Sequence, residues 1–315
     1  MKYMAWFLRR LGSLLFTMLA VTFLAFAAFT MISGSPAQAM LGMEATPERV
    51  AALEAELGLD RPLPVRYGEW LAGFFTGNLG VSLSYRQEVG QLLGGKAAVT
   101  LLLSGISFAL IVAASIPLAL LSARFAGGPL DGLHTALNQF CMAVPPFFTG
   151  IVLSWFFGLT LRLFQPGAFP GLDQFGAAVQ YLFFAAVCIA IPRTAMTVRM
   201  LRGTILHELE KDYVRTALAR GNSLGGVLWR HVLKNALCPT VTFLAQTMAE
   251  IVAGGIVVEQ VFAIPGLGRM LVVSIANRDY PVVQAIVVIL AFWVVLSATV
   301  ADLVNAWIDP RLRLG

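Results

Sequence analysis

Charged residues are scarce in this 315-residue chain. They make up only 12% of it, whereas hydrophobic residues make up 58%, and the mean hydropathy is +0.79. An average soluble domain carries about 25% charged residues. The deficit excludes a soluble globular domain, and several apolar segments exceed the roughly 18 residues that mark a membrane-spanning helix. The sequence therefore predicts an all-α integral membrane protein that crosses the bilayer several times.

Cysteine and histidine are also rare, with three residues of each type. Cys141, Cys188 and Cys238 lie in apolar segments without CxxC spacing, which argues against a disulfide framework or a zinc site. The histidines are too scattered to predict a ligand set, and no arrangement of nucleophile and base stands out. We expect no metal site and no catalytic residue in this chain.

Two further patterns suggest functions that we reject. The run from Gly90 to Lys96 has the spacing of a phosphate-binding loop, but Ala97 replaces the Ser or Thr that holds magnesium, and no strand precedes the glycines. The net charge of +5 comes from basic residues spread through short loops rather than gathered in a stripe. We therefore expect neither ATP hydrolysis nor nucleic-acid binding by this chain.

Six apolar runs are long enough to cross a bilayer, and each must be helical because backbone groups in lipid have to be satisfied internally. The first run resembles a secretory signal, with Ala37-Gln38-Ala39 after it. It is longer than the roughly 7–15 residues of a signal core, which favours an uncleaved first span. The predicted spans are residues 11–32, 97–122, 135–160, 178–200, 236–260 and 282–308.

The distribution of Lys and Arg predicts the orientation. When the six spans are threaded through a membrane, most basic residues of the short loops fall on the side of the N-terminus, which places both termini in the cytoplasm. The predicted organisation is a cytoplasmic N-terminus (1–10), a first span (11–32), an extracytoplasmic cap (33–96), a five-helix core (97–308) that includes a cytoplasmic coupling segment (203–235), and a cytoplasmic tail (309–315).

The segment 33–96 carries its own helix signals. Thr46 is placed to cap a helix, Pro47 to occupy its first position and Gly58 to end it. An aromatic patch around Trp70 and Phe74 is predicted either to lie at the membrane surface or to pack the cap. We therefore expect a small folded cap after the first span.

Prolines and polar residues inside the spans are candidates for a translocation path. Pro145 and Pro146 fall near the middle of the third span, where each removes a helical hydrogen bond, and Asn138 lies nearby. A plain kink for helix packing is the favoured interpretation, and a substrate path is the alternative.

The fifth span carries a polar stripe in which Thr242, Gln246, Glu250 and Gly254 recur every fourth residue. An ionisable group within a span is a candidate functional site, so Glu250 is predicted to face a pathway or a subunit junction; a structural hydrogen bond to a neighbouring helix is the alternative. The candidate path or gate residues are Asn138, Met142, Pro145, Gln246 and Glu250.

The acidic residues near the inner end of the sixth span have a structural interpretation. Asp302 and Asp309 are expected to pair with basic groups such as Arg9, Arg10 or Arg193.

The polar stretch from Asp212 to Asn235 lies between two long apolar spans and is too short to be a domain. It is rich in Arg and interrupted by Gly221 and by Gly225-Gly226. Such a helical segment suits docking to another protein, whereas an ordinary solvated loop is the alternative. The candidate docking residues are Asp212, Arg215, Ala217, Arg220, Gly221, Asn222 and Leu224.

This stretch, read on to Pro239, resembles the cytoplasmic coupling segment of permease subunits in ATP-binding-cassette importers of the peptide/nickel class. The superfamily pattern is Glu-Ala-Ala, three residues, Gly and, about ten residues later, Ile-x-Leu-Pro. Ala217, Gly221 and Leu233 match it. The remaining positions of the pattern are occupied here by Arg215, Thr216, His231 and Lys234.

The resemblance extends along nearly the whole chain. Gly34-Ser35-Pro36 departs from it, with Ser where the class usually has Asp. The matching segments, in the same order as in that class, are Leu57–Leu63, Asn78–Gly80, Pro265–Arg269, Asn277–Pro281 and Asp309–Arg311.

The resemblance implies a permease subunit of an ATP-driven importer in a bacterial or archaeal cytoplasmic membrane. It implies as partners a second homologous permease, an extracytoplasmic solute-binding protein and two ATPase subunits that hold ATP and magnesium; this chain itself would bind no cofactor. Di- or oligopeptides are the expected solute, and nickel or a metal chelate is the alternative. A stand-alone secondary transporter or channel is the alternative of another class, but the inverted repeats that would favour it are absent.

Overall fold

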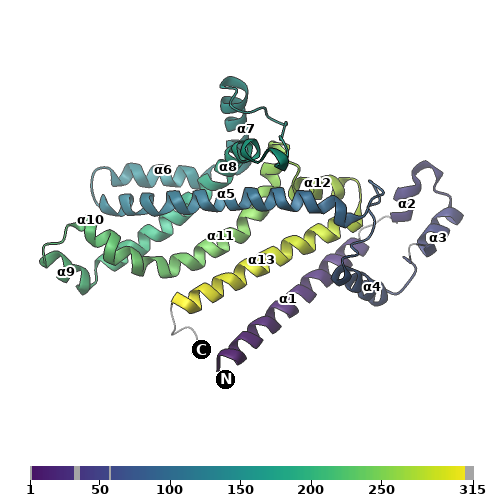
Figure 1. The fold of residues 1–315 in the computed structure, drawn as a ribbon, viewed down its shortest axis with the longest axis horizontal. Helices are drawn as coiled ribbons and strands as arrows, with labels where there is room; N and C mark the ends of the chain where they lie inside the picture. Colours follow the sequence, from purple (N-terminus) through teal and green to yellow (C-terminus); the bar gives the residue numbers. More distant parts are fainter. Residues whose placement is uncertain (1, 32–35, 57, 309–315) are drawn as a thin grey trace. The chain divides into compact units, whose positions relative to one another are not determined.

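The computed structural model describes residues 2–31, 36–56 and 58–308. Across these ranges the chain is helical, and the only strand-like pairing is an isolated bridge between Val81 and Glu88. The all-α prediction is therefore confirmed (Figure 1). The helices are α1 (Lys2–Met31), α2 (Pro36–Leu41), the 3-10 helix η1 (Gly42–Glu44), α3 (Pro47–Glu56), α4 (Leu63–Thr76), α5 (Val89–Arg124), α6 (Asp131–Ala143), α7 (Pro146–Leu153), the π-helix η2 (Ser154–Thr160), the 3-10 helix η3 (Leu172–Gln174), α8 (Phe175–Leu209), α9 (Asp212–Ala219), α10 (Leu224–Val227), the π-helix η4 (Leu228–Val232), α11 (Leu233–Val261), α12 (Leu267–Ala276) and α13 (Tyr280–Ile308).

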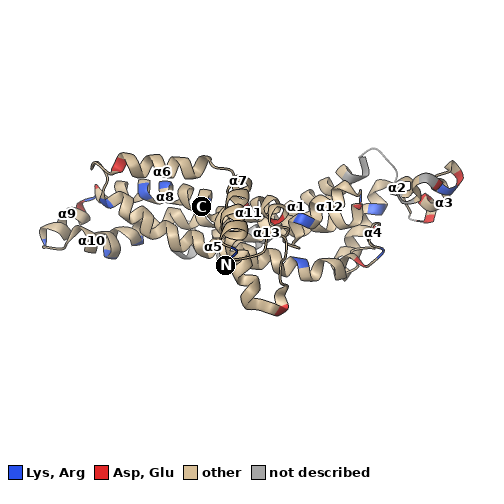
Figure 2. Cartoon of the chain, turned by 90° about the horizontal axis from the view of Figure 1, so that it is seen from above, with Lys and Arg blue, Asp and Glu red and all other residues tan. Residues whose placement is uncertain are grey.

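Four helical segments are long and apolar enough to cross a membrane, namely Val89–Arg124, Leu172–Leu209, Leu224–Val261 and Tyr280–Val304. The pair formed by α6 and the α7–η2 segment would be a fifth if it counts as one broken span. Figure 2 shows how little charge these helices carry, since most of their ribbon is tan. The described apolar part of α1, Gly12–Ala28, is shorter than the other candidates. The chain is thus a multi-pass membrane protein.

The predicted third span is broken at its centre, where a kink was expected. Helix α6 ends at Ala143, and the chain turns by 94° before the segment that begins at Pro146. Pro146 forces the residue before it out of the helical region, and Pro145 is extended there with ψ of 141°. The favoured kink is therefore a break. Single prolines behave differently, because Pro117, Pro192 and Pro239 lie inside continuous helices.

The described chain divides into two compact units. The first comprises residues 1–99 and 265–295, and the second comprises residues 100–264 and 296–315. The predicted tail 309–315, with the motif Asp309–Arg311, lies outside the described residues, as do Leu57 and the Gly34-Ser35 part of the departing motif.

In the first unit, the helix signals of the predicted cap are confirmed. Pro47 is the first residue of α3, the Arg49 N–H lies 3.4 Å from the Thr46 hydroxyl oxygen, and Gly58 follows the helix with a positive φ of 64°. Helix α4 packs on α1, because the Thr22 and Tyr67 hydroxyls lie 2.8 Å apart. The Trp70 ring lies 5.8 Å from that of Phe26 between centroids, so the aromatic patch packs against the first helix.

A buried carboxylate joins two distant motifs of the same unit. Asp279 is 0% exposed; it accepts a hydrogen bond from the Ser82 hydroxyl at 2.5 Å and bonds from the N–H groups of Leu83 and Ser84 at 3.1 and 3.2 Å. Gly80, which has a φ of 83°, lies beside Pro281, and an added Cβ would make an ordinary van der Waals contact with the proline ring at 3.8 Å. The motifs Asn78–Gly80 and Asn277–Pro281 therefore form one packed turn.

In the second unit, α8 is the central helix and contacts α6, α7 and α11. An aromatic cluster covers one end: the Tyr181 hydroxyl donates to the Phe262 carbonyl at 2.5 Å and accepts from the Gly167 N–H at 2.9 Å. Phe164 stacks on Phe262 with ring centroids 5.9 Å apart. An aliphatic cluster, described below, joins α5, α8 and the α9–α10 segment.

Candidate functional site

The predicted docking helix Asp212–Leu224 is not one helix. Helix α9 ends at Ala219, and α10 begins only at Leu224. The Gly221 N–H donates to the Leu218 carbonyl at 2.9 Å, and the Asn222 N–H donates to the Ala217 carbonyl at 3.4 Å. This pair of bonds, with Gly221 at a φ of 86°, is the left-handed ending that glycine favours. Gly221 therefore has a local structural reason to be glycine.

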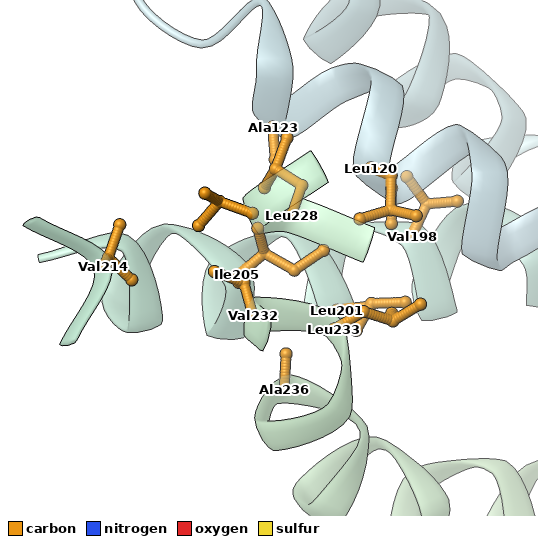
Figure 3. Close-up of a cluster of buried hydrophobic side chains, with 12 residues drawn as sticks. Leu120, Ala123, Val198, Leu201, Ile205, Val214, Leu228, Val232, Leu233 and Ala236 are labelled. Carbon is orange, nitrogen blue, oxygen red and sulfur yellow. The ribbon is translucent and has the colours of Figure 1, made fainter. Parts of the chain in front are cut away.

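The α9–α10 segment is fixed to the membrane helices by an aliphatic cluster (Figure 3). Val214 of α9 and Val227 of α10 are buried in it with Leu201 and Ile205 of α8. Burying side chains of this kind stabilises by about 1.5–3 kcal/mol each. The segment is thus rigidly attached to the core. The whole cluster comprises Ala119, Leu120, Ala123, Val198, Leu201, Ile205, Val214, Val227, Leu228, Val232, Leu233 and Ala236.

Hydrogen bonds to one buried carboxylate hold the turn that leads into α9. Glu208 is buried, and it accepts hydrogen bonds from the Lys211 ammonium group and, at 2.8 Å, from the Tyr213 hydroxyl. The bond to Glu208 raises the pKa of Lys211 above its ordinary value. Burial raises the pKa of the Tyr213 hydroxyl above its ordinary value. These bonds tie the start of α9 to the last turn of α8.

The outer surface of the segment combines large apolar and basic side chains. Leu218, Leu224 and Trp229 are 39%, 41% and 58% exposed. Arg215, Arg220 and Arg230 lie within a few residues of them in the sequence and are also exposed. Exposed apolar groups with charged neighbours are typical of a protein-docking surface. Trp229 and Arg230 belong to η4, which follows α10 directly, and we call these six residues the α9–α10 surface.

The other predicted docking residues occupy different positions. Ala217 is only half-exposed and packs against the chain's own aliphatic cluster. Asp212 is exposed and forms a loose ion pair with Arg215 at 3.8 Å, and the Asn222 side-chain amide donates to the Ala217 carbonyl at 2.9 Å. Sequence reasoning missed Leu218 and Trp229, although apolar residues in a polar segment are the signal that could have found them.

The predicted path residues are not brought together. Asn138 of α6 donates to the Ala195 carbonyl of α8 at 3.0 Å, with the Met142 sulfur 3.8 Å from the same amide. Glu250 of α11 instead pairs with Arg193, which lies about half a turn from Ala195 around α8. Asn138 and Met142 therefore lie on one side of α8 and Glu250 on another. Pro145 is exposed at the α6–α7 break.

Glu250 forms an ion pair with Arg193 of α8, with the Arg193 Nη1 donating to the Glu250 Oε2. Its structural alternative, a bond to a neighbouring helix, is thus present. Arg193 is one of three basic groups predicted to pair with the acidic end of α13, and it forms an ion pair with Glu250. Gln246, Glu250 and Val257 remain exposed along α11, as a junction with another subunit requires.

A second carboxylate in α11 escaped sequence reasoning. Glu259 is 0% exposed and accepts a hydrogen bond from the Thr100 hydroxyl of α5 at 2.6 Å. It lies two residues from the end of α11, so that its position in the sequence suggested a helix boundary rather than a buried group. Across the described ranges, no group of three or more His, Cys, Asp or Glu residues is placed to hold a metal ion.

Comparison with known proteins identifies the family. Residues 115–314 match the family described as the inner membrane component of binding-protein-dependent transport systems, and residues 3–85 match the N-terminal family of the same membrane components. The chain belongs to this permease family. The expectation drawn from the coupling segment and the motifs is confirmed.

Relatives of this permease align with nearly the whole chain. A probable peptide ABC transporter permease of Sinorhizobium fredii is 34% identical over 308 residues, covering 97% of this chain and 98% of that protein. A putative peptide transport system permease of Brucella abortus is 33% identical, with the same coverage. The dipeptide transport permease DppB of Alkalihalophilus pseudofirmus is 28% identical over 331 residues, covering 98% of this chain and 99% of DppB.

Proposed function

We propose that this permease forms, with a second homologous permease, the path by which an ATP-driven importer moves di- or oligopeptides across the cytoplasmic membrane. The relatives named above are peptide or dipeptide permeases, which favours peptides over nickel or a metal chelate. A solute-binding protein would deliver the peptide outside. Two ATPase subunits would bind ATP and magnesium inside, since the family is one of membrane components.

The six-span organisation is part of this proposal. Residues 11–32 would form the first span, 33–96 the extracytoplasmic cap and 97–308 the five-helix core, with 1–10 and 309–315 in the cytoplasm. Cysteines introduced singly at Glu54 and Asp173 should react with an impermeant thiol reagent in intact cells, whereas cysteines at Ser223 and Arg313 should not. Labelling of the Ser223 position from outside would contradict the orientation.

The α9–α10 surface carries the proposed coupling. Leu218, Leu224 and Trp229 would enter a groove on one ATPase, and the arginines would meet acidic groups at its rim. Because Val214 and Val227 are buried against α8, movement of the docked segment would be transmitted to the membrane helices rather than absorbed by a flexible loop. Closure of the ATPases on ATP would thereby shift the spans between two states.

The exposed stripe of α11 is the proposed junction with the second permease and the gate. Glu250→Gln removes the charge of the Arg193 pair while keeping the shape of the side chain. If the pair lines the gate, we expect peptide-stimulated uptake to fall several-fold at unchanged complex yield. Glu250→Leu should lower both uptake and yield. Normal uptake by Glu250→Gln would leave only a structural role.

The whole proposal is tested by reconstitution. The permease pair, the two ATPases and the binding protein would be placed in liposomes, and uptake of labelled di- and tripeptides would be compared with uptake of a nickel chelate. We expect peptide uptake that requires ATP on the side of the membrane where the ATPases lie. Uptake that proceeds on an ion gradient without ATPases would overturn the proposal, and uptake of the chelate alone would overturn the solute.

A further inference from the structure

A cavity of about 640 Å³ lies between α5, α6 and α8 in the second unit. Its size falls within the roughly 300–1,000 Å³ of small-molecule sites. The cavity is amphipathic along its length. One end is lined by Leu110, Ala114 and Ile191, and the end beside the α5–α6 connection is lined by His134, Arg199 and Arg202. Blue segments of α8 lie beside α6 in Figure 2.

The part of the cavity between its apolar end and Arg199 is about as long as one leaflet of a bilayer. The lining on α8 continues to Leu206, and the part from Val187 to Arg199 spans twelve residues, or about 18 Å along a helix. Half of the roughly 30 Å hydrocarbon core of a membrane is about 15 Å. A single acyl chain could therefore extend from the basic end to the apolar end without leaving the cavity.

The basic end has donors to offer an anion. The Arg202 Nη2 donates to the Asp131 carboxylate at 2.5 Å, while the Arg202 Nε is buried and has no hydrogen-bond partner among the described residues. A buried donor of this kind costs about 1–3 kcal/mol when it is left unsatisfied. Arg199 is exposed at the same end and makes no ion pair within the described ranges, so the charge of this end is positive.

We propose that this cavity binds one anionic phospholipid. Its phosphate lies between Arg199 and Arg202, and one acyl chain lies against Leu110, Ala114 and Ile191. A bilayer supplies this ligand at high local concentration, and the gradient from basic to apolar lining runs in the same sense as a lipid from headgroup to chain. The bound lipid fills the space between α6 and α8 and holds α6 in place below its break at Pro145.

The transported peptide is a poor match for this cavity. Its lining is mostly apolar although it includes Asn138, one of the predicted path residues, and Ile191, Ala195 and Arg202 lie on a different face of α8 from Arg193, which pairs with Glu250. The lipid site is therefore separate from the α11 stripe, and its existence does not depend on which solute is imported.

The test uses the complete transporter, purified in detergent and stripped of lipid. Phosphatidylglycerol, phosphatidylcholine or glycerol phosphate would be added, and bound lipid would be counted by native mass spectrometry beside the thermal unfolding midpoint. We expect one phosphatidylglycerol per permease chain, a raised midpoint and no such effect of the other two compounds. Equal retention of phosphatidylcholine, or stabilisation by glycerol phosphate alone, would overturn the proposal.

Two pairs of variants sharpen this test. Ala114→Trp fills the apolar end, and Ala113→Trp, one residue away on an exposed face of α5, is its control. Arg199→Gln removes the free charge, and Arg124→Gln, at an exposed position outside the cavity, is its control. Ala114→Trp should abolish retention, and Arg199→Gln should weaken it by about tenfold, the loss that one charge-assisted bond of about 1.4 kcal/mol would cause.

A separate experiment tests whether a protein helix, rather than a lipid, fills the cavity. The native Cys141, a half-buried residue of the cavity lining, would be offered to a bifunctional thiol crosslinker in the assembled complex. Crosslinking to another subunit would show that a protein helix fills the cavity, which would overturn the proposal. Lipid retention that is unchanged in Ala114→Trp and Arg199→Gln, measured on monodisperse complexes, would overturn it as well.

Discussion

The α9–α10 segment and the turn at residues 82–85 are both irregular connections held in place, but by opposite means. The α9–α10 segment is fixed by many aliphatic side chains, each contributing a share. The turn is fixed by one carboxylate, Asp279, which accepts three hydrogen bonds in a fully buried position. An apolar cluster distributes stability over many residues, whereas a buried acceptor concentrates it in one. Substitutions in the two regions should therefore differ in how much stability a single residue removes.

The largest effect is expected at Asp279. Asp279→Ala removes the acceptor of three hydrogen bonds, and since bonds to a carboxylate contribute about 1.5–3 kcal/mol each, we expect a loss of at least about 3 kcal/mol of unfolding free energy. Chemical unfolding of the purified permease, with proteolysis near residue 82, would measure it. Asp173→Ala, at an accessible carboxylate, is the control. A loss below 1 kcal/mol would show that the turn is held by other contacts.

A smaller loss is expected from the aliphatic cluster. Leu228 is 2% exposed, and Leu228→Ala should destabilise by about 2–4 kcal/mol through lost burial and a residual cavity. Because the cluster is shared by α5, α8 and η4, we expect proteolytic susceptibility to rise throughout the α9–α10 segment. Leu224→Ala, exposed four residues earlier, is the matched control. Equal stability of the two variants would contradict the anchoring role of the cluster.

The exposed residues of the same segment should separate function from stability. Trp229→Ala and Leu218→Ala should change the unfolding free energy by no more than about 0.5 kcal/mol, as is usual at the surface. Peptide uptake and co-purification of the ATPases should nevertheless fall at least tenfold. This test is cleaner than one at Ala217, because a large residue there would also disturb the chain's own cluster. Normal co-purification of both variants would remove the docking role.

The smallest effect is expected at Gly221. Its φ of 86° makes Gly221→Ala unfavourable by about 1–2 kcal/mol, whereas Gly221→Asn should be better tolerated in the left-handed region. No neighbouring atom of the chain lies within 4 Å of an added Cβ, so the difference should come from backbone conformation alone. Thermal unfolding of both variants would measure it. If Gly221→Asn preserves the stability of the protein but abolishes binding of the ATPases, Gly221 also contacts the partner.

Local signals were sufficient to predict several boundaries. Thr46 and Pro47 predicted the start of α3 and Gly58 its end, because capping and positive φ depend on only a few neighbouring residues. The scarcity of charge predicted the membrane helices for the same reason. The double proline was harder: a proline removes one hydrogen bond, but two in succession placed Pro145 in an extended conformation and turned a predicted kink into a 94° break.

The partners of polar residues could not be predicted from such local signals. Glu250 was recognised as important in an apolar span, but two alternatives remained because its partner, Arg193, is 57 residues away. The docking residues stay a prediction, and Ala217 shows why the sequence could not assign their roles: its partial burial depends on the aliphatic cluster that packs beneath α9. Whether a side chain at a given helical position faces the chain's own core or a partner is a property of the packed helices.

That this chain is a helical membrane protein of the permease family follows from its residues alone, because hydrophobicity, turn residues and short motifs are local properties. Which of those local features meet depends on how the helices pack. Ser82 and Asp279 are 197 residues apart in the chain and in hydrogen-bonding contact in the fold. The split between α9 and α10 and the cavity lined by α5, α6 and α8 likewise arise from packing, because no single segment contains both sides of a contact.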